Sequence, residues 1–393
     1  MYPLRGRALA RYLSYVTWQM AAGDVVLVTG YPSQLAREVC AEAIRSDDST
    51  RVCALTPSRR LEKARAQLEK LPEGQRRRMV LIEGDASAID LGLSGAELKS
   101  LALEVTRIHH CAGVLHSGID RATAERANVG GAKEALEMAS QCGRLESLVF
   151  HSTAFVSGDR TGIVREDELK EGQSFRSAIE ETHARAEKLM RAAMTRLPIV
   201  VVRPTTVVGD SRTGDVDHLD GPYLLILLMV TSPPDLALPL PARGDAPLNL
   251  VPIDWVAQAS VALGRDRRAR GRTFHLADPR ALTARGVFEL VARALGRPPP
   301  WGSIPTGLAK AILRAPGLER LANSPRAFLE TLTTPVTYDA RGTDELLPSL
   351  GVAPCPRLET YVDRLVEHVK ERGRHAVGPR QEDLSRDAEE PLG

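Results

Sequence analysis

The sequence has little cysteine, almost no net charge and no long apolar run. Its five cysteines are scattered over 393 residues without a CxxC pair, so the chain shows neither a disulfide framework nor a zinc signature. We therefore expect a reducing compartment, the cytoplasm. No grouping of His, Cys and carboxylate residues has metal-ligand spacing, and no metal is predicted. Because 52 basic residues nearly balance 50 acidic ones, nothing in the overall charge favours nucleic acid as a partner.

The apolar segments are too short to cross a membrane. The densest, YLLILLMV at 223–230, has fewer than half of the roughly 20 residues that a spanning helix needs, so we expect a buried helix or pocket wall and no stable membrane insertion. Residues 1–22 are positively charged and partly amphipathic but lack a continuous signal-peptide core and a cleavage site. They predict a peripheral helix packed on the domain, or alternatively a helix that binds a membrane surface or a partner.

The apolar runs that are present alternate with helix-length polar segments. A chain of this length can form one large domain or two smaller ones. The alternation predicts an α/β fold with a doubly wound parallel sheet of the Rossmann type, covered by helices on both faces. The expected strands lie within residues 24–29, 51–56, 79–85, 105–113, 147–154 and 197–204.

Beyond Pro204 this rhythm gives way to sequence rich in Gly, Asp and Pro. The predicted organisation is an N-terminal helix at 1–22, a dinucleotide-binding domain at 23–210, a smaller substrate region at 211–372 and a tail at 373–393. The substrate region is interrupted and mainly helical, with returns to the main sheet near 247–276. The tail is polar and charged, and we expect it to be disordered.

The segment DVVLVTGYPSQLA at 24–36 has the strand, turn and helix that begin a dinucleotide site, but it lacks most of the usual glycines. In the full fingerprint three glycines provide the turn, the close approach to the pyrophosphate and the close packing of the helix. Only Gly30 is present, with Ser33 and Ala36 at the later places. The turn predicts a cofactor site but is not specific by itself.

Six further motifs resemble one family. Together they make the chain, over roughly residues 24–369, similar to the extended short-chain dehydrogenase/reductase superfamily, in the branch of thioester reductases and fatty acyl-CoA reductases. The run GDSRTG followed by DGPY is the most specific part. The motifs are GDASAIDLGLS (84–94), IHHCAG (108–113), NVGGAKEALEMA (128–139), FHSTAFVSG (150–158), RPTTVVGDSRTGDVDHLDGPY (203–223) and LVPIDWVAQA (250–259).

The resemblance implies a nicotinamide cofactor, NADP or NAD, with NADP slightly favoured. Asp85 would accept a hydrogen bond from the adenine amino group, and Ala112 and Gly113 would leave room for the cofactor backbone. Arg59 and Arg60 would pair with the 2′-phosphate of NADP, or alternatively form a solvated first helical turn. The cofactor residues implied are Thr29, Gly30, Ser33, Gln34, Leu35, Arg59, Arg60, Asp85, Ala112, Gly113, Asn128, Arg203 and Pro204.

The same resemblance implies a catalytic Ser or Thr, a Tyr that donates the proton and a Lys that lowers the pKa of that Tyr. Thr153 stands at the hydroxyl position, with Ser152 beside it. The Tyr and Lys belong four residues apart on one helix face, where this chain has Ile179 and His183. Isoleucine has no proton to give, and histidine is at most a partial cation near neutral pH.

Two other groups could supply the proton: Tyr223 in the DGPY run, or His183 itself if burial and a carboxylate tuned its pKa. Two hypotheses follow. In the first, the chain is an atypical NAD(P)-dependent reductase of CoA-bound or carrier-bound acyl thioesters, with slow or altered activity. In the second, it is a catalytically inactive reductase fold that acts as a binding or regulatory module, with a protein partner.

Overall fold

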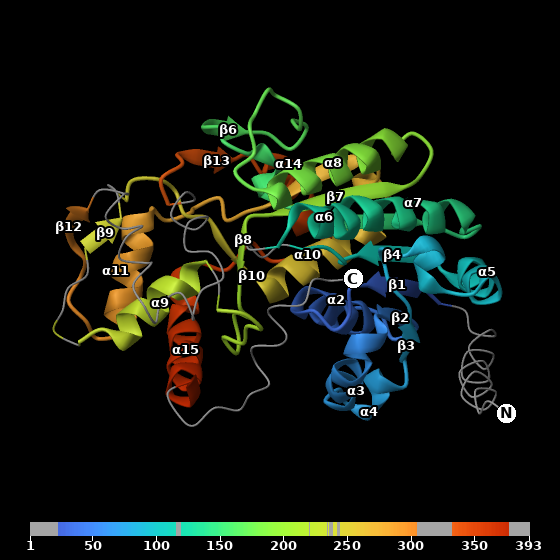
Figure 1. Cartoon of the computed structure of the whole chain (residues 1–393), viewed down its shortest axis with the longest axis horizontal. Coiled ribbons are helices and arrows are strands. Elements are labelled where there is room, and N and C mark those ends of the chain that lie inside the picture. The colour runs from blue at the N-terminus through green and yellow to red at the C-terminus, as the bar shows by residue number, and fades with distance from the viewer. Residues whose placement is uncertain are drawn as a thin grey trace.

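The computed structural model describes residues 23–114, 119–219, 221–233, 235, 239–241, 244–304 and 332–376. Its centre is a sheet of seven parallel strands in the order β11-β7-β5-β4-β1-β2-β3 (Figure 1). The expected α/β fold is thereby confirmed. The strands are β1 (Val25–Thr29), β2 (Arg51–Thr56), β3 (Met79–Glu83), β4 (Arg107–His110), β5 (Ser147–His151), β7 (Ile199–Pro204) and β11 (Arg272–Leu276).

Strand β1 shows why the sheet is covered on both faces. Successive side chains of a strand point to opposite faces. Val25 and Leu27 pack in one apolar cluster, and Val26 and Val28 in another. Helices α5 (Gly95–Glu104), α7 (Gly131–Gln141) and α8 (Ala178–Ala193) supply the first cluster, and α2 (Gln34–Arg45), α3 (Leu61–Glu69) and α10 (Ile253–Arg265) supply the second (Figure 1).

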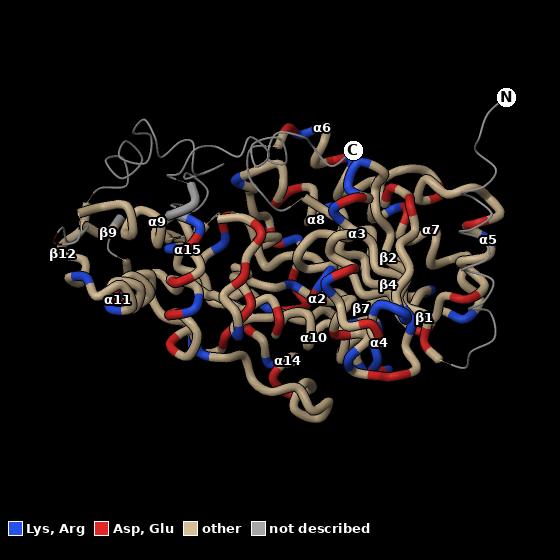
Figure 2. Tube along the Cα trace, turned by 90° about the horizontal axis from the view of Figure 1, so that it is seen from below, with Lys and Arg blue, Asp and Glu red and all other residues tan. Residues whose placement is uncertain are grey.

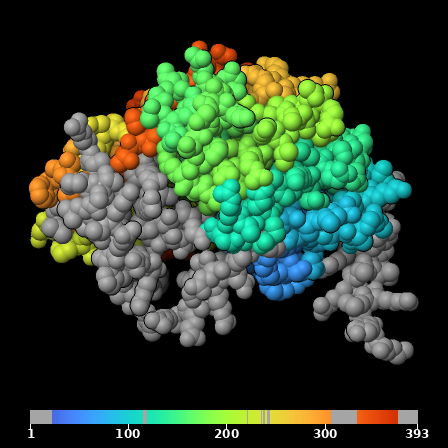
Figure 3. Space-filling model, turned by 45° about the horizontal axis from the view of Figure 1, so that its top comes forward, coloured from blue at the N-terminus to red at the C-terminus, as the bar shows by residue number. Residues whose placement is uncertain are grey.

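Short helical segments connect these elements. Glu125–Gly130 (η3) is a π-helical segment between α6 and α7, and it packs with α6 and α8. Figure 3 shows the green segments, which include α8, in one continuous surface with the teal α6 and α7. The others are η1 (Ser58–Arg60), α4 (Glu73–Arg76), η2 (Ile89–Gly92), α6 (Arg121–Ala124), η4 (Ala154–Ser157) and η5 (Arg267–Ala269).

The C-terminal region packs three helices around a second apolar core. Ile226 of α9, Phe288 of α11 and Leu365 of α15 are buried in it. Residues 223–230 form most of α9, and no helix within the described ranges is both long and apolar enough to cross a bilayer. The three helices are α9 (Pro222–Thr231), α11 (Ala284–Ala294) and α15 (Val362–Ala376), and the other helical segments of this region are α14 (Arg341–Leu346), η6 (Leu347–Leu350) and η7 (Leu358–Thr360).

Three small parallel strand pairs lie outside the main sheet. The pairs are β8 (Thr206–Val208) with β10 (Leu250–Pro252), β9 (Pro239–Pro241) with β12 (Trp301–Ile304), and β6 (Gly162–Val164) with β13 (Val336–Tyr338).

The two chain ends are only partly covered by the described residues. The helix predicted at 1–22 lies outside them. Helix α15 continues through Ala376, four residues into the segment predicted as a tail, and the rest of that segment lies outside the described residues. Figure 2 shows basic and acidic positions interleaved along the described trace, in keeping with the nearly balanced charge.

Candidate functional site

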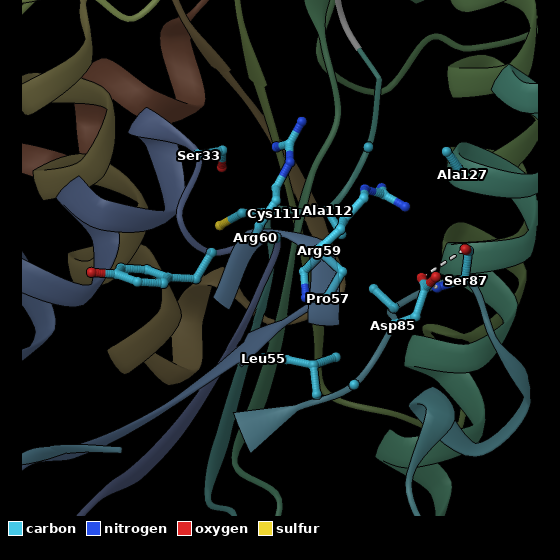
Figure 4. A pocket seen from close by; sticks show the side chains of 15 residues that line it. Ser33, Leu55, Pro57, Arg59, Arg60, Asp85, Ser87, Cys111, Ala112 and Ala127 are labelled. Atoms are coloured by element: carbon cyan, nitrogen blue, oxygen red, sulfur yellow. Dashed lines mark hydrogen bonds between the residues drawn. The ribbon is translucent and has the colours of Figure 1, made fainter. Parts of the chain in front are cut away.

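An open cleft of about 560 Å³, including the solvent at its mouth, lies at the carboxyl ends of β1, β2, β3 and β4. The strand order reverses between β1 and β4, and the crevice outside such a switch point is where doubly wound sheets bind ligands. In Figure 4, Arg59 and Arg60 extend into the space between Ser33 and the pair formed by Asp85 and Ser87. The lining residues are Gly30, Tyr31, Ser33, Leu55, Pro57, Arg59, Arg60, Gly84, Asp85, Ala86, Ser87, Cys111, Ala112, Gly113 and Ala127.

The turn after β1 requires glycine at position 30. Gly30 has φ +86°, and a Cβ atom there would lie 2.8 Å from the backbone nitrogen of Ala112. Thr29 lies behind the turn, where its Oγ1 accepts a hydrogen bond from the Ala112 N–H at 3.2 Å and lies 3.0 Å from Nδ1 of His110. Thr29 therefore ties β1 to the end of β4 and is not among the lining residues.

Ser33 stands at the place of the second glycine and caps α2. Its Oγ accepts a hydrogen bond from the Ala36 N–H at 3.4 Å, as expected of an N-cap serine. The side chain lines the cleft beside the positive end of the helix dipole, where negative phosphate groups are stabilised. Ala36, at the third place, is fully buried against the sheet.

Gln34 and Leu35, both predicted to bind the cofactor, have other contacts. The Gln34 side chain donates from Nε2 to the Asp215 carbonyl at 2.8 Å and accepts at Oε1 from the Asp217 N–H at 3.0 Å. Arg37, one turn further along α2, forms two hydrogen bonds of 2.9 Å with the Asp217 carboxylate. Leu35 packs between two apolar clusters. We name residues 209–217 the strap, because this segment is anchored on α2.

The strap contains the GDSRTG motif and is fastened at three further places. Ser211 donates from its N–H and its hydroxyl to the carboxylate of Asp254 in α10, at 2.9 and 2.7 Å. Arg364 of α15 donates to the Ser211 carbonyl at 3.0 Å, and Arg372 donates to the Val216 carbonyl at 2.6 Å. The motif that is most specific in the sequence thus makes contacts between the sheet domain and the C-terminal helices.

The far end of the cleft combines one carboxylate with two arginines. The hydrogen bonds of the Asp85 carboxylate both end on Oδ1, from the N–H and the hydroxyl of Ser87 at 2.9 and 2.8 Å (Figure 4). Arg59 is exposed and Arg60 is half-buried. Cys111 also lines this space, and burial raises the pKa of its thiol well above the usual value, so it is protonated.

Hydrogen bonds hold Asn128 and His183 against Val114, in the segment that follows β4. Asn128 accepts at Oδ1 from the Val114 N–H at 2.7 Å and donates from Nδ2 to Thr182 Oγ1 at 2.9 Å. Nε2 of His183 lies 3.0 Å from the Val114 carbonyl oxygen, which can only accept, so the ring carries its proton on Nε2. Burial lowers the pKa of His183 to about 4, and the ring is therefore neutral near pH 7.

The remaining predicted catalytic residues of this end lie on α8 and after β5. Ile179 is on α8, one turn before His183, and is 8% exposed. Ser152 donates its hydroxyl proton to Glu187 at 2.7 Å. Thr153 accepts at Oγ1 from the Phe155 N–H at 3.3 Å, and no acceptor for its own hydroxyl proton is recorded among the described residues.

Arg203 and Pro204 lie outside the cleft lining. Arg203 is fully buried and forms a two-point contact with Glu187, with Nη2 to Oε1 at 2.7 Å and Nε to Oε2 at 3.0 Å. It also donates to Nε2 of His275 at 3.3 Å, so His275 is a neutral acceptor there. Pro204 ends β7, paired with Leu276. Arg203 thus belongs to a buried ion network with Glu187 of α8.

Tyr223 also lies outside the cleft lining. Its Oη accepts a hydrogen bond from the Gly209 N–H at 2.5 Å, and its side chain is buried in the core of α9, α11 and α15. Burial raises the pKa of this phenol well above 10, which makes it a weaker acid. Tyr223 borders a separate, narrow apolar pocket between these helices.

Sequence reasoning did not single out eight of the lining residues. Seven of them lie at or directly after the ends of predicted strands. They could have been found by treating every residue at those strand ends as a candidate site residue. Ala127 comes from the π-helical segment and carried no signal in the sequence. The eight are Tyr31, Leu55, Pro57, Gly84, Ala86, Ser87, Cys111 and Ala127. Among the described residues, no group of three His, Cys, Asp or Glu side chains could hold a metal ion.

The sheet order and the cleft at its switch point define a doubly wound, dinucleotide-binding domain of the Rossmann type. Residues 29–260 match the NAD-binding family described as Male sterility protein. The chain belongs to this family, the thioester reductase family of extended short-chain dehydrogenases, and the resemblance stated from the sequence is confirmed.

Characterised relatives are much longer than this chain. The chain is 26% identical over 270 residues to a subunit of the linear gramicidin synthase of Brevibacillus parabrevis, a match that covers 66% of this chain and 5% of that protein. It is 28% identical over 229 residues to glycine betaine reductase ATRR of Emericella nidulans, covering 56% and 17%. It is 23% identical over 232 residues to fatty acyl-CoA reductase wat of Drosophila melanogaster, covering 51% and 44%.

Solved structures share the fold. The terminal R domain from the myxalamid PKS-NRPS biosynthetic pathway superposes with a TM-score of 0.74 at 24% identity, covering 93% of this chain and 98% of that one. UDP-glucuronic acid 4-epimerase from Bacillus cereus, in complex with NAD, superposes with a TM-score of 0.64 at 18% identity, covering 89% and 99%. At these identities the likeness establishes the fold alone.

Proposed function

We propose that this chain binds a nicotinamide dinucleotide, NADP in preference to NAD, and has lost rapid carbonyl reduction by the usual tyrosine and lysine. One observation carries the proposal: His183, at the lysine position, is neutral and donates its only N–H to the Val114 carbonyl, while Ile179 takes the tyrosine position. A protein that lacks this catalytic pair would act by binding a ligand or a partner and not by rapid reduction.

The cleft fits the adenosine and phosphate groups of the cofactor. The close approach of Gly30 to Ala112 leaves no room for a side chain in the turn, as expected where backbone meets pyrophosphate. Arg59 and Arg60 border the cleft where two guanidinium groups can pair with a ribose phosphate, which supports NADP. A bound reduced dinucleotide would supply hydride.

Reduction of a carbonyl also consumes a proton, and each candidate donor is unsuited to supply it. Ile179 has no ionisable group. His183 uses its N–H internally, and its lowered pKa keeps it from carrying a second proton near pH 7. Tyr223 lies outside the cleft lining with a raised pKa. The geometry supports cofactor binding better than it supports proton transfer.

A second function is slow reduction of a CoA-bound or carrier-bound acyl thioester. The observation that favours it is Thr153, which stands at the family's hydroxyl position and has no recorded acceptor for its own proton among the described residues. A general acid contributes about 10²-fold to 10⁴-fold in rate, so loss of the acid slows this chemistry without abolishing it. The free state of all five cysteines agrees with the cytoplasm, where such thioesters occur.

Titration of the purified full chain with NADPH and NADH, followed by fluorescence and by the rise in Tm, tests the proposal. We expect saturable binding of NADPH, weaker binding of NADH, and at most slow NADPH oxidation when acyl-CoA is added. Absence of binding of either nucleotide at about millimolar concentration contradicts dinucleotide binding. Rapid acyl-CoA-dependent oxidation contradicts the loss of catalysis.

A further inference from the structure

Helices α3 and α4 and the turn before β3 carry an excess of positive charge. Residues 61–78 contain six basic and three acidic residues, a net charge of +3. Lys70 and Arg76 are exposed and form no ion pair within the part of the chain that the structure describes. The arginines of this stretch that do pair with neighbouring glutamates are themselves exposed, so the pairs leave most of the surface charge in water. The six basic residues are Lys63, Arg65, Lys70, Arg76, Arg77 and Arg78.

The segment that follows α15 has the opposite charge. Residues 377–393 contain five acidic residues and two arginines, a net charge of −3. The segment has no run of apolar residues, so a contact between it and the rest of the molecule depends on charge and not on packing. The acidic residues are Glu382, Asp383, Asp387, Glu389 and Glu390.

The last turns of α15 lie close to α3, with the strap between them. Arg372 of α15 donates hydrogen bonds to the Val216 and Asp217 carbonyls at 2.6 and 3.1 Å. Burial alone would raise the pKa of the Asp217 carboxyl, but the hydrogen bonds and charge of Arg37 and the charge of Lys63 in α3 hold it below its ordinary value. Figure 1 shows the end of α15 on the same side of the molecule as α3 and α4.

Residues 377–393 are long enough to cover both helices. Helix α15 ends at Ala376, and Glu382 is six residues further on, a span of up to about 20 Å in extended chain. Glu390 can reach more than twice as far, whereas α3 is about 14 Å long. A short tether keeps its end at an effective concentration of about millimolar, so a weak attraction is enough to hold it.

From this match of charge and reach we propose that residues 377–393 lie against α3 and α4, with their carboxylates beside the exposed lysines and arginines of these helices. The contact is intramolecular and electrostatic. Each exposed ion pair contributes little, but several act together on one tethered segment. The segment thereby shields a basic surface that would otherwise attract other polyanions.

Carbodiimide crosslinking of the full chain tests this contact, because the reagent joins a carboxylate directly to a neighbouring lysine amine. By mass spectrometry we expect residues 382–390 to link to Lys63 and Lys70 at least about threefold more than to Lys99 and Lys133, exposed lysines of α5 and α7. The excess should disappear when the ionic strength rises from about 0.01 M to about 1 M, which shortens the Debye length from about 30 to about 3 Å.

Two results of this experiment overturn the inference. Equal yields at the four lysines show that the segment has no preferred surface. Yields at α3 that increase with protein concentration assign the contact to the same segment of a second copy and exclude the intramolecular contact, whose yield does not depend on concentration.

A pair of double variants tests whether α3 and α4 provide the attraction. R76Q/R77Q removes two exposed charges from this surface, and we expect the yield at Lys70 to fall at least about twofold. R121Q/R185Q is the matched control, because it removes two exposed arginines from α6 and α8 and should leave that yield unchanged. An unchanged yield in R76Q/R77Q, or equal losses in both variants, overturns the inference.

Discussion

His183 Nε2 lies 3.0 Å from the Val114 carbonyl oxygen, so this side chain, which we propose stands at the family's lysine position, links the segment after β4 to α8. Gly113, the neighbour of Val114, lines the cleft, and a Cβ there would lie 3.5 Å from the ring of His183. The histidine therefore shapes the cleft wall without entering the cleft. It has a positioning role toward β4.

Restoring the usual pair should restore catalysis if α8 is aligned with the family as proposed. We expect the double variant I179Y/H183K to raise acyl-CoA-dependent NADPH oxidation by about 10²-fold to 10⁴-fold, the contribution of a general acid. Initial rates measured by NADPH absorbance give the comparison. I179F/H183K, which has the same ring without the hydroxyl, is the control and should remain at the original rate. Equal rates for the two double variants contradict the alignment.

The contact between Glu187 and Arg203 predicts a large stability effect. Burial alone would raise the pKa of Glu187, but the nearby charges of Arg203 and Arg191 and the hydrogen bonds hold it below its ordinary value. E187Q leaves the buried Arg203 charge uncompensated, and we expect a loss of about 3–5 kcal/mol in the free energy of unfolding, measured with urea.

The control for that variant is a more exposed ion pair, between Glu125 of η3 and Arg185 of α8. E125Q breaks the contact with Arg185, whose side chain is 49% exposed. Exposed pairs contribute about 1 kcal/mol or less, so E125Q should change stability little. Similar losses in E187Q and E125Q are incompatible with a special role for the buried pair.

The buried histidines predict a loss of stability in mild acid. Burial lowers the pKa of His110, His183 and His275 to about 4 and that of His151 to about 3, and it lowers the pKa of His109. In the unfolded chain each pKa is about 6.5, so stability is fully present above this pH and falls as the pH decreases toward the folded values.

Near pH 5.5 the unfolded state should bind about four or five more protons than the folded state through these groups. Urea unfolding at several pH values between 5 and 7 gives this number from the slope. A slope below about two protons shows that the rings titrate in the folded protein.

Tyr223 is expected to matter for folding and not for proton transfer. Y223F removes the acceptor of the Gly209 N–H, and we expect a loss of about 1–3 kcal/mol in stability. Affinity for NADPH and any residual oxidation rate should stay the same. A lower rate with unchanged stability identifies the phenol as the acid after all.

Hydrogen exchange of single backbone amides can test how the strap is anchored on α2. In Q34L the Asp217 N–H loses its acceptor, so its hydrogen exchange should become faster. The Ser211 N–H, held by Asp254, provides the internal control and should be less affected. Unchanged exchange at Asp217 contradicts the anchoring by Gln34.

The main sheet was predictable because its strands are buried on both faces, which makes them continuous apolar runs such as VVLVT in β1 and IVVV in β7. The pairing of β6 with β13 was not predictable. Each has only three residues, and they are far apart in the chain, so neither alternation nor a turn signal marks them.

The candidate site was predictable where its residues stand at the ends of predicted strands. Residues at strand ends, such as Gly30 and Asp85, are placed by the topology and line the cleft. Gln34 was assigned from its place in the motif, but its side chain meets the strap, 181 residues away in sequence. Contacts of this range depend on how the C-terminal region packs, which no local pattern contains.

Strand β11 has a consequence for how this chain can be divided. The family match ends at residue 260, but Arg272–Leu276 pairs with β7 and completes the sheet, and Trp255 donates from Nε1 to the Ala353 carbonyl. A fragment cut at residue 260 would present β7 as a bare, apolar edge strand, the kind of edge that pairs with other copies and aggregates. A fragment intended for soluble expression should therefore extend at least to Ala353.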